Sequence, residues 1–311
     1  MNIYNHPLRR LLPQALCAML LYALVSAAAL GLSFEVPPLV APPSTEHHAG
    51  KVIWVDLLTP DIAAAKQFYA GLFGWTFQDI KTGDSNYAIA SLGGRPVGGL
   101  FQRKASRSED RRSAWLGFIA VTDVDGAEKN AVAHGAKLLK EPRTYAQRGR
   151  QAVLADPEGA VFAMLASSSG DPADELADPG EWIWSSVHVN DPDKEAAFYQ
   201  TVFGYDVFDA DSDAKSDSVI LSSDDFARAS VNALPKDMDT THPRHPHWLN
   251  FVRVTDADSA AAKAVALGGR VLLQPRPDKH GGKLAIIADP AGAVFGVMEW
   301  SDTDSTQEPK Q

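Results

Sequence analysis

The sequence WIWSSVHVNDPDKEAAFYQTVFGY at residues 182–205 has an earlier copy, VIWVDLLTPDIAAAKQFYAGLFGW, at residues 52–75. The two stretches align without a gap at a constant offset of 130 residues. They share Ile53/Ile183, Trp54/Trp184, Asp61/Asp191, Phe68/Phe198, Tyr69/Tyr199, Phe73/Phe203 and Gly74/Gly204. A repeat of this kind predicts that the same structural unit occurs twice in the chain.

Each copy has the sequence pattern of a strand followed by a helix. Residues 51–58 are rich in β-branched and aromatic side chains, which is typical of a strand. Thr59-Pro60-Asp61 then signals the start of a helix that Gly74 ends. Short strands are expected at 75–80, 87–92 and 97–101, separated by glycine turns. The unit is therefore βαβββ.

A second unit of the same order starts at Trp115, with Asp123 as the cap of a helix that runs through His134. Strands are expected at 137–139, 151–155 and 161–165. This unit is also repeated, at an offset of 133 residues. WLGFIAVTDVDGA aligns with WLNFVRVTDADSA, and AVLADPEGAVFAML aligns with AIIADPAGAVFGVM. The sequence predicts an α+β fold of four βαβββ modules in two domains.

The domain boundaries follow from composition. Residues 1–34 are predicted as a signal peptide or membrane anchor, 35–50 as a proline-rich spacer, 51–167 as the first domain, 168–180 as an acidic linker, 181–301 as the second domain and 302–311 as a polar tail.

The N-terminus carries Arg9 and Arg10 before residues 11–34, which contain no charged side chain. Residues 27–29 (Ala-Ala-Ala) resemble a cleavage site, while 24 uncharged residues are long enough to span a bilayer. A buried N-terminal helix is the structural alternative. The positively charged residues before this segment, Arg9 and Arg10, should stay on the cytoplasmic side of the membrane. We therefore expect an exported protein, periplasmic or extracellular, either cleaved or anchored by residues 11–34.

The charge balance excludes several classes of partner. The net charge is −10, and beyond residue 34 the chain has 27 basic against 39 acidic residues. A nucleic-acid binder needs cations to neutralise phosphates, and an anionic membrane surface would repel the folded part. Cys17 is the only cysteine, so the folded part has no disulfide, thiolate zinc site or cysteine nucleophile. Gly93-Gly94 and Gly98-Gly99 are interpreted as hairpin turns and not as a phosphate loop.

The repeated motifs, D-x4–6-A-x2-FY-x3-FG[WY] and ADP-x-GAVF, resemble those of the vicinal oxygen chelate superfamily, which includes glyoxalase I, bleomycin-resistance proteins and extradiol dioxygenases. The resemblance covers about 250 residues. It implies that two modules form a curved, cup-shaped mixed sheet with a divalent metal in the cup. The ligands would come from the first strand of each module and from a glutamate on the last strand.

The positions that the resemblance assigns to this metal carry few donors. The first-strand positions are Trp54, Leu116, Trp184 and Leu249, none of which binds a metal. The last-strand positions are Ala166 and Glu299. A catalytic metal normally needs three protein ligands. We therefore expect no resident metal or other cofactor. The alternative is a divalent metal held by Glu299 together with His188 or His247.

Strand alternation names the residues that face each cup. The first cup receives Trp54, Asp56 and Leu58, with Phe118 and Ala120 opposite; the second receives Trp184, Ser186 and His188, with Phe251, Arg253 and Glu299 opposite. Ile53 and Ile183, of the other parity, are expected to face the helices. Trp54, Asp56, Phe118, Trp184, Ser186 and Phe251 are the candidate ligand-binding residues, because apolar walls with a few polar groups are typical of a small-molecule site.

If the protein is an enzyme, the second cup is where we expect catalysis. His188 would be the general acid or base, Arg253 would hold an anionic or carbonyl oxygen, and Glu299 would orient one of them. The structural alternatives are core tryptophans, a hydrogen-bonded strand histidine and a simple Arg–Glu pair. His242, His245 and His247 have metal-like spacing but lie in a proline-broken loop.

Three functions remain open from the sequence. The first is a metal-independent protein that binds a small, partly aromatic molecule. The second is a metal-dependent lyase or dioxygenase with unconventional ligands. The third is a surface interaction module. The sequence does not indicate the oligomeric state.

Overall fold

The computed structural model describes residues 36–82, 85–103, 112–210, 218–234, 245–278 and 281–300. The predicted export segment, the polar tail and His242 lie outside these ranges. Among the described residues, no helix is both long enough and apolar enough to cross a membrane.

The chain forms two mixed sheets of eight strands each, with the same strand order. The first sheet runs β2-β3-β4-β1-β5-β8-β7-β6 and comprises β1 (Val52–Thr59), β2 (Thr76–Thr82), β3 (Ser85–Leu92), β4 (Arg95–Gln102), β5 (Ala114–Ala120), β6 (Lys137–Tyr145), β7 (Gly149–Ala155) and β8 (Val161–Ser167). The second runs β10-β11-β12-β9-β13-β16-β15-β14 and comprises β9 (Trp182–Val189), β10 (Asp206–Asp209), β11 (Ser218–Ser223), β12 (Phe226–Ala233), β13 (His247–Val254), β14 (Arg270–Pro277), β15 (Lys283–Ala288) and β16 (Val294–Glu299). The predicted α+β fold of four βαβββ modules is confirmed.

Each module contributes one helix: α2 (Ile62–Phe73), α3 (Val124–Ala133), α4 (Pro192–Phe203) and α5 (Ala257–Ala266). All four helices start after an aspartate whose carboxylate accepts a hydrogen bond from a backbone N–H of the first turn. In α2 and α4, the repeated glycines Gly74 and Gly204 adopt left-handed φ values of 76° and 73° and end the helix.

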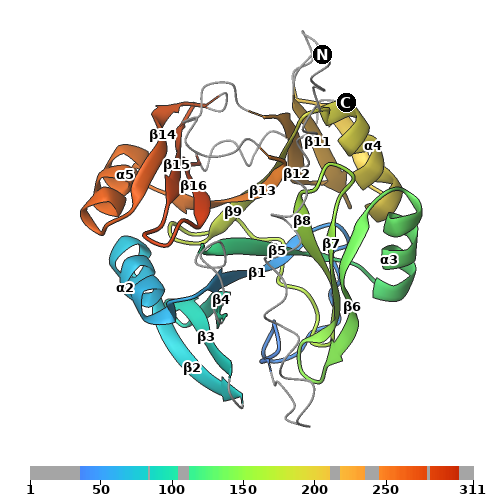
Figure 1. Cartoon of the computed structure of the whole chain (residues 1–311), viewed down its shortest axis with the longest axis horizontal. Helices are drawn as coiled ribbons and strands as arrows, with labels where there is room; N and C mark the ends of the chain where they lie inside the picture. Colours follow the sequence, from blue (N-terminus) through green and yellow to red (C-terminus); the bar gives the residue numbers. More distant parts are fainter. Residues whose placement is uncertain are drawn as a thin grey trace, which may run out of the picture.

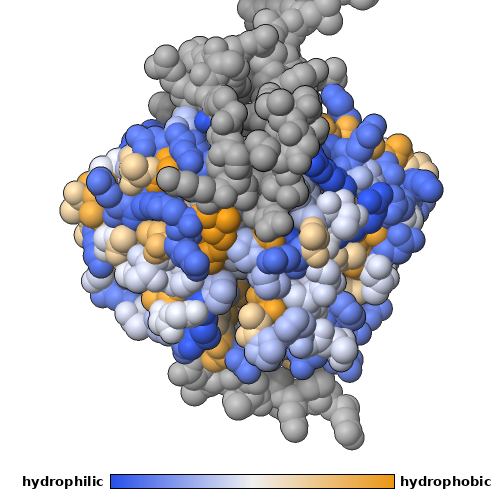
Figure 2. Space-filling view, turned by 90° about the horizontal axis from the view of Figure 1, so that it is seen from below, coloured by the Kyte–Doolittle hydropathy of each residue, from blue (hydrophilic) through white to orange (hydrophobic). Residues whose placement is uncertain are grey.

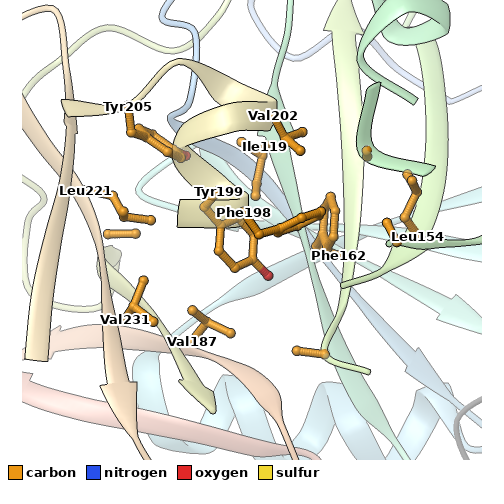
Figure 3. Packing of buried hydrophobic residues seen from close by; sticks show 14 of the residues in the cluster. Ile119, Leu154, Phe162, Val187, Phe198, Tyr199, Val202, Tyr205, Leu221 and Val231 are labelled. Atoms are coloured by element: carbon orange, nitrogen blue, oxygen red, sulfur yellow. The ribbon is translucent and has the colours of Figure 1, made fainter. Parts of the chain in front are cut away.

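The two domains pack back to back, with the helices in pairs beside the sheets (Figure 1). One hydrophobic cluster joins α2 and its strands to α5 and its strands, and includes Phe68, Leu72, Ala260 and Phe295. A second joins α3 to α4, and Figure 3 shows Phe162 of β8 lying beside Tyr199 of α4. Each cluster therefore contains modules from both domains.

A polar contact crosses each of these clusters. Tyr199 of α4 donates a hydrogen bond to Asp156 Oδ2 of the first domain (2.8 Å) and accepts one from Trp248 Nε1 (2.9 Å). Asp156 Oδ1 also accepts backbone N–H groups of the turn that follows it. The other cluster repeats this arrangement with Tyr69, Asp289 and Trp115. The FY, W-L-x-F and ADP motifs thus meet between domains, where their polar atoms satisfy one another.

The linker at residues 168–180 contains no helix or strand but is held in place. Asp174 forms ion pairs with Lys51 (2.8 Å) and with Arg228 (2.6 Å), whose side chain is almost fully buried. Asp171 accepts a hydrogen bond from the backbone N–H of His48 (2.8 Å). The linker and the spacer before β1 are therefore parts of the packed structure.

Removing the hydroxyl of Tyr199 should weaken the contact between domains. Tyr199→Phe leaves Asp156 Oδ2 and the Trp248 N–H without their partner, so we expect the free energy of unfolding to fall by about 2 kcal/mol. Combined with Asp156→Asn in a double-mutant cycle, the coupling energy measured by denaturant unfolding should be at least about 1 kcal/mol. Strictly additive effects would show that the contact does not stabilise the protein.

A buried carboxyl group lies next to this contact. Glu195 of α4 is fully buried, and neither carboxyl oxygen has a hydrogen-bond partner among the described residues. It faces Asp156 and Glu158 from the turn between β7 and β8, and Asp191 and Lys194 from its own helix. Burial, and secondly the charge of Asp156, raise the pKa of Glu195 to about 8. The equivalent position in the first module is Ala65.

The stability of the protein should therefore depend on pH. The folded state holds the proton of Glu195 up to about pH 8, whereas the unfolded chain releases it near the ordinary value of 4.5. Stability is thus lost as the pH rises between these two values, by at most about 1.4 kcal/mol per unit. In Glu195→Gln, thermal unfolding between pH 5 and 8 should show a smaller loss. The exposed Glu141→Gln is the matched control, and equal slopes in both variants would contradict the assignment.

Candidate functional site

The face of each sheet that is turned away from the helices, here called the cup face, carries its own hydrophobic cluster. In the first sheet the cluster includes Trp54, Leu116 and Phe118, and in the second it includes Leu249 and Phe251 with Trp184 packed against them. Trp54 lies opposite Phe118 in the pairing of β1 with β5, and Trp184 lies opposite Phe251 in the pairing of β9 with β13. The structure thus places the predicted aromatic residues on the cup faces.

The alternation is interrupted near the start of β1 and β9. A register shift lies between Val52 and Trp54, and the matching shift in β9 lies between Trp182 and Trp184. Such a bulge places two successive residues against one on the partner strand. Ile53 and Ile183 therefore join the cup-face clusters, and the prediction that they face the helices is wrong. Trp182 instead packs between the domains, with its indole N–H donating to the Val97 carbonyl (2.7 Å).

Asp56 is a carboxylate on the first cup face. Its Oδ1 accepts hydrogen bonds from Trp54 Nε1 and from the Tyr87 hydroxyl, both at 2.8 Å. Burial raises the pKa of Asp56, while Arg148 and the two hydrogen bonds oppose that rise. Gly99 allows this packing, because a Cβ there would overlap Tyr87 and Asp56. Gly98 and Gly99 lie inside β4, so the prediction that they form a hairpin turn is wrong.

The first cup face is also covered by the chain itself. Val36 and Leu39, from the predicted spacer, are buried in its cluster, and Trp54 keeps only 6% of its surface exposed. In Figure 1 this dark blue segment lies in the lower opening of the first sheet.

The second cup face presents two tryptophans. Trp184 stacks with Trp300 at 6.3 Å between ring centroids and an interplanar angle of 26°, and both residues are only half-buried. The indole N–H of Trp184 donates to Ser230 Oγ at 3.1 Å, which fixes the ring. Beside them, Phe251 occupies space that Gly296 leaves free, since a Cβ at Gly296 would overlap the phenyl ring.

Polar groups gather at one end of the second cup face. Ser186 Oγ and His188 Nε2 are 2.9 Å apart, in a hydrogen bond whose direction depends on the tautomer. The rings of His188 and His247 stack at 5.4 Å. Burial, and secondly the neighbouring His247, lower the pKa of His188 to about 3. His188 is therefore neutral at pH 7 and a weak proton acceptor, which disfavours a role as general base.

Arg253 and Glu299 lie at the opposite end. The antiparallel register of β9 and β13 places His188 beside His247, whereas Arg253 is six residues further along β13, roughly 20 Å away. The Arg253 guanidinium donates to the carbonyls of Ala177 and Trp300. The structure does not bring His188 and Arg253 together, because sheet alternation defines a face but not a position along it.

Glu299 lies on the helix side of the second sheet. Alternation along β16 places Met298 in the cup-face cluster and Val297 in the cluster between domains. Glu299 Oε1 accepts the Ala257 N–H at the start of α5 (2.9 Å), and Oε2 accepts the Lys283 N–H (3.1 Å). Its carboxylate thus stabilises the helix N-terminus. The prediction that Glu299 faces the cup with His188 and Arg253 is wrong.

The described residues of the cup faces do not bring together the usual ligands of a metal. Across the described ranges, no group of three His, Cys, Asp or Glu side chains is close enough to hold an ion. His188 and His247 are adjacent, but Glu299 is at the far end of the sheet. His245 is exposed, and its ring centroid is 6.0 Å from that of His247. Two imidazoles alone do not fit the three ligands that a catalytic metal normally requires.

Several side chains at these sites were not found from the sequence. They are Val36, Leu39, Tyr87, Arg148, Ser230, Asn232 and Trp300. Only Trp300, which directly follows the last repeated strand, gave a signal that sequence reasoning could have used. A separate surface depression of about 520 Å³ lies between α5 and β14, and none of the candidate residues lines it.

Comparison with known proteins places both halves in one group. Residues 52–165 and 184–298 each match a family model described as a glyoxalase-like domain. A Mycobacterium tuberculosis protein named "Putative glyoxylase CFP32" is 32% identical over 261 residues, covering 83% of this chain and 98% of its own length. The anthracycline biosynthesis protein DauV of Streptomyces sp. (strain C5) is 30% identical over 267 residues, covering 82% and 95%.

Solved structures share the fold at lower identity. The Mn(II)-bound glyoxalase from Novosphingobium aromaticivorans superimposes with a TM-score of 0.54 and 18% identity, covering 81% of this chain and 83% of its own. At this identity the likeness concerns the fold alone.

Proposed function

The chain belongs to the family of glyoxalase-like domains, within the vicinal oxygen chelate superfamily, and from this premise we propose that it binds a flat aromatic small molecule on its second cup face. The observation that carries the proposal is the half-buried pair of Trp184 and Trp300, which stack beside Phe251 on the second cup face.

The side chains of this face suit such a ligand. Aromatic rings bury large areas and favour stacked or edge-on contact with another ring. The polar end offers Ser186 and the neutral His188, which can pair with hydroxyl or carbonyl groups on the rim of a ring system. Apolar walls with a few convergent polar groups describe a small-molecule site.

The names of the relatives support a ligand of this type. Two of them, DauV and DnrV, are named as anthracycline biosynthesis proteins. Anthracyclines are polycyclic aromatic molecules. A fused aromatic ring system with oxygen substituents is therefore the ligand class that we assign to the second cup.

The alternative is a metal-dependent lyase or dioxygenase, favoured by the adjacent neutral imidazoles of His188 and His247. Metal analysis of the purified full chain separates the two, because stoichiometric zinc, iron, manganese or nickel would favour the enzyme. A surface interaction module is the third candidate. On the face seen in Figure 2, hydrophobic residues lie in separate patches among hydrophilic side chains.

The aromatic pair makes the proposal testable with alizarin, a dihydroxyanthraquinone, as the probe. Trp184→Leu removes the ring on which the probe would stack, so the dissociation constant measured by calorimetry should rise about tenfold or more. His188→Ala should weaken binding less, because it removes one neutral hydrogen-bonding group. The matched control is His134→Ala, which changes an exposed histidine at the C-cap of α3. Unchanged affinity in Trp184→Leu would overturn the proposal.

We also propose that the protein acts outside the cytoplasm. This rests on the uncharged residues 11–34 behind Arg9 and Arg10. Fractionation of the native host should recover the folded chain from the membrane, periplasmic or extracellular fraction. Recovery of the full-length chain from the cytoplasm would contradict export.

A further inference from the structure

The first cup face is occupied by residues 36–40, here called the strap. Val36 and Leu39 keep 5% and 6% of their surface exposed and belong to the same cluster as Trp54 and Phe118. The backbone N–H groups of Leu39 and Val40 both donate to Ser169 Oγ, at 2.9 and 3.2 Å. The strap therefore places apolar side chains where a ligand of this cup would lie.

Arg148 connects the strap to the cup face. Its guanidinium lies over the ring of Trp54, 4.3 Å from the centroid, and its Nε donates to the Pro37 carbonyl at 2.8 Å. The residue is 2% exposed. Its Nη2 is buried and meets no hydrogen-bond acceptor among the described residues. A buried cationic donor without a partner is unusual, and this one can donate to a further acceptor group.

The geometry of the guanidinium indicates what that group is. Nε–H and Nη2–H point in the same direction and match the two oxygens of a carboxylate. The single carbonyl oxygen of Pro37 satisfies one of them. Asp56 does not fill the other position, since its Oδ1 accepts from Trp54 and Tyr87 and Nη2 remains without a partner.

We propose that the first cup is a binding site for a small aromatic carboxylate, and that the strap is a displaceable stand-in for this ligand. The carboxylate oxygens accept hydrogen bonds from both Nε and Nη2 of Arg148 and replace the Pro37 carbonyl. The ring takes the place of Val36 and Leu39 beside Trp54 and Phe118. The inference does not depend on the second cup.

The experiment uses the full chain, benzoate as the probe and benzamide, its neutral analogue, as the matched control. Benzoate should accelerate hydrogen exchange of the Leu39 and Val40 amides, because binding displaces the strap. Leu39→Asn removes an apolar anchor of the strap and should tighten benzoate binding about tenfold. Ser169→Ala, which removes the acceptor for both strap amides, should act in the same direction if Leu39→Asn fails to fold.

Two further variants locate the site. Arg148→Gln should abolish benzoate binding, and benzamide should bind at least tenfold more weakly than benzoate to the original chain and to Leu39→Asn. Trp184→Leu should leave benzoate binding unchanged, which excludes the second cup as its site. The proposal is overturned if benzoate leaves strap exchange unchanged, if loosening the strap does not tighten binding, or if Arg148→Gln binds as well as the original chain.

Discussion

The hydrogen bond between a helix tyrosine and an aspartate of the other domain is the contact on which the rest of the structure depends. It occurs twice, as Tyr199–Asp156 and Tyr69–Asp289. In each case a tryptophan N–H donates a hydrogen bond to the tyrosine hydroxyl. These polar atoms are buried, so leaving any of them without a partner would be costly. Because the tyrosine and the aspartate of each pair belong to different domains, this hydrogen bond forms only when the domains are packed together.

This packing places the helix side of both sheets in the contact between domains, and the two cup faces take no part in it. The faces then differ through a few residues. The strap and Arg148 cover the first face around Asp56. The second face has Ser186 and His188 at the positions of Asp56 and Leu58, and its tryptophans remain half-buried. The duplication supplied two equal frameworks, and local substitutions gave them different chemistry.

Strand alternation was enough to place Trp54, Phe118, Trp184, Ser186 and Phe251 on the cup faces, because side chains of a strand alternate strictly. It failed for Ile53 and Ile183, where a bulge changes the parity. It also failed for Glu299, which lies one residue away from the cup-face position Met298. The grouping of His188 with Arg253 failed for another reason, since alternation carries no information about the distance along a strand.

The sequence by itself determined the modules, their order and their pairing into two domains, because repeats, helix caps and alternation are local patterns. Tertiary structure alone decided which polar groups meet. The Tyr–Asp bridges, the His188–His247 stack and the contact of Arg148 with Pro37 join residues that lie 43 or more positions apart. Such contacts depend on strand register and on the packing of one domain against the other, which no local pattern encodes.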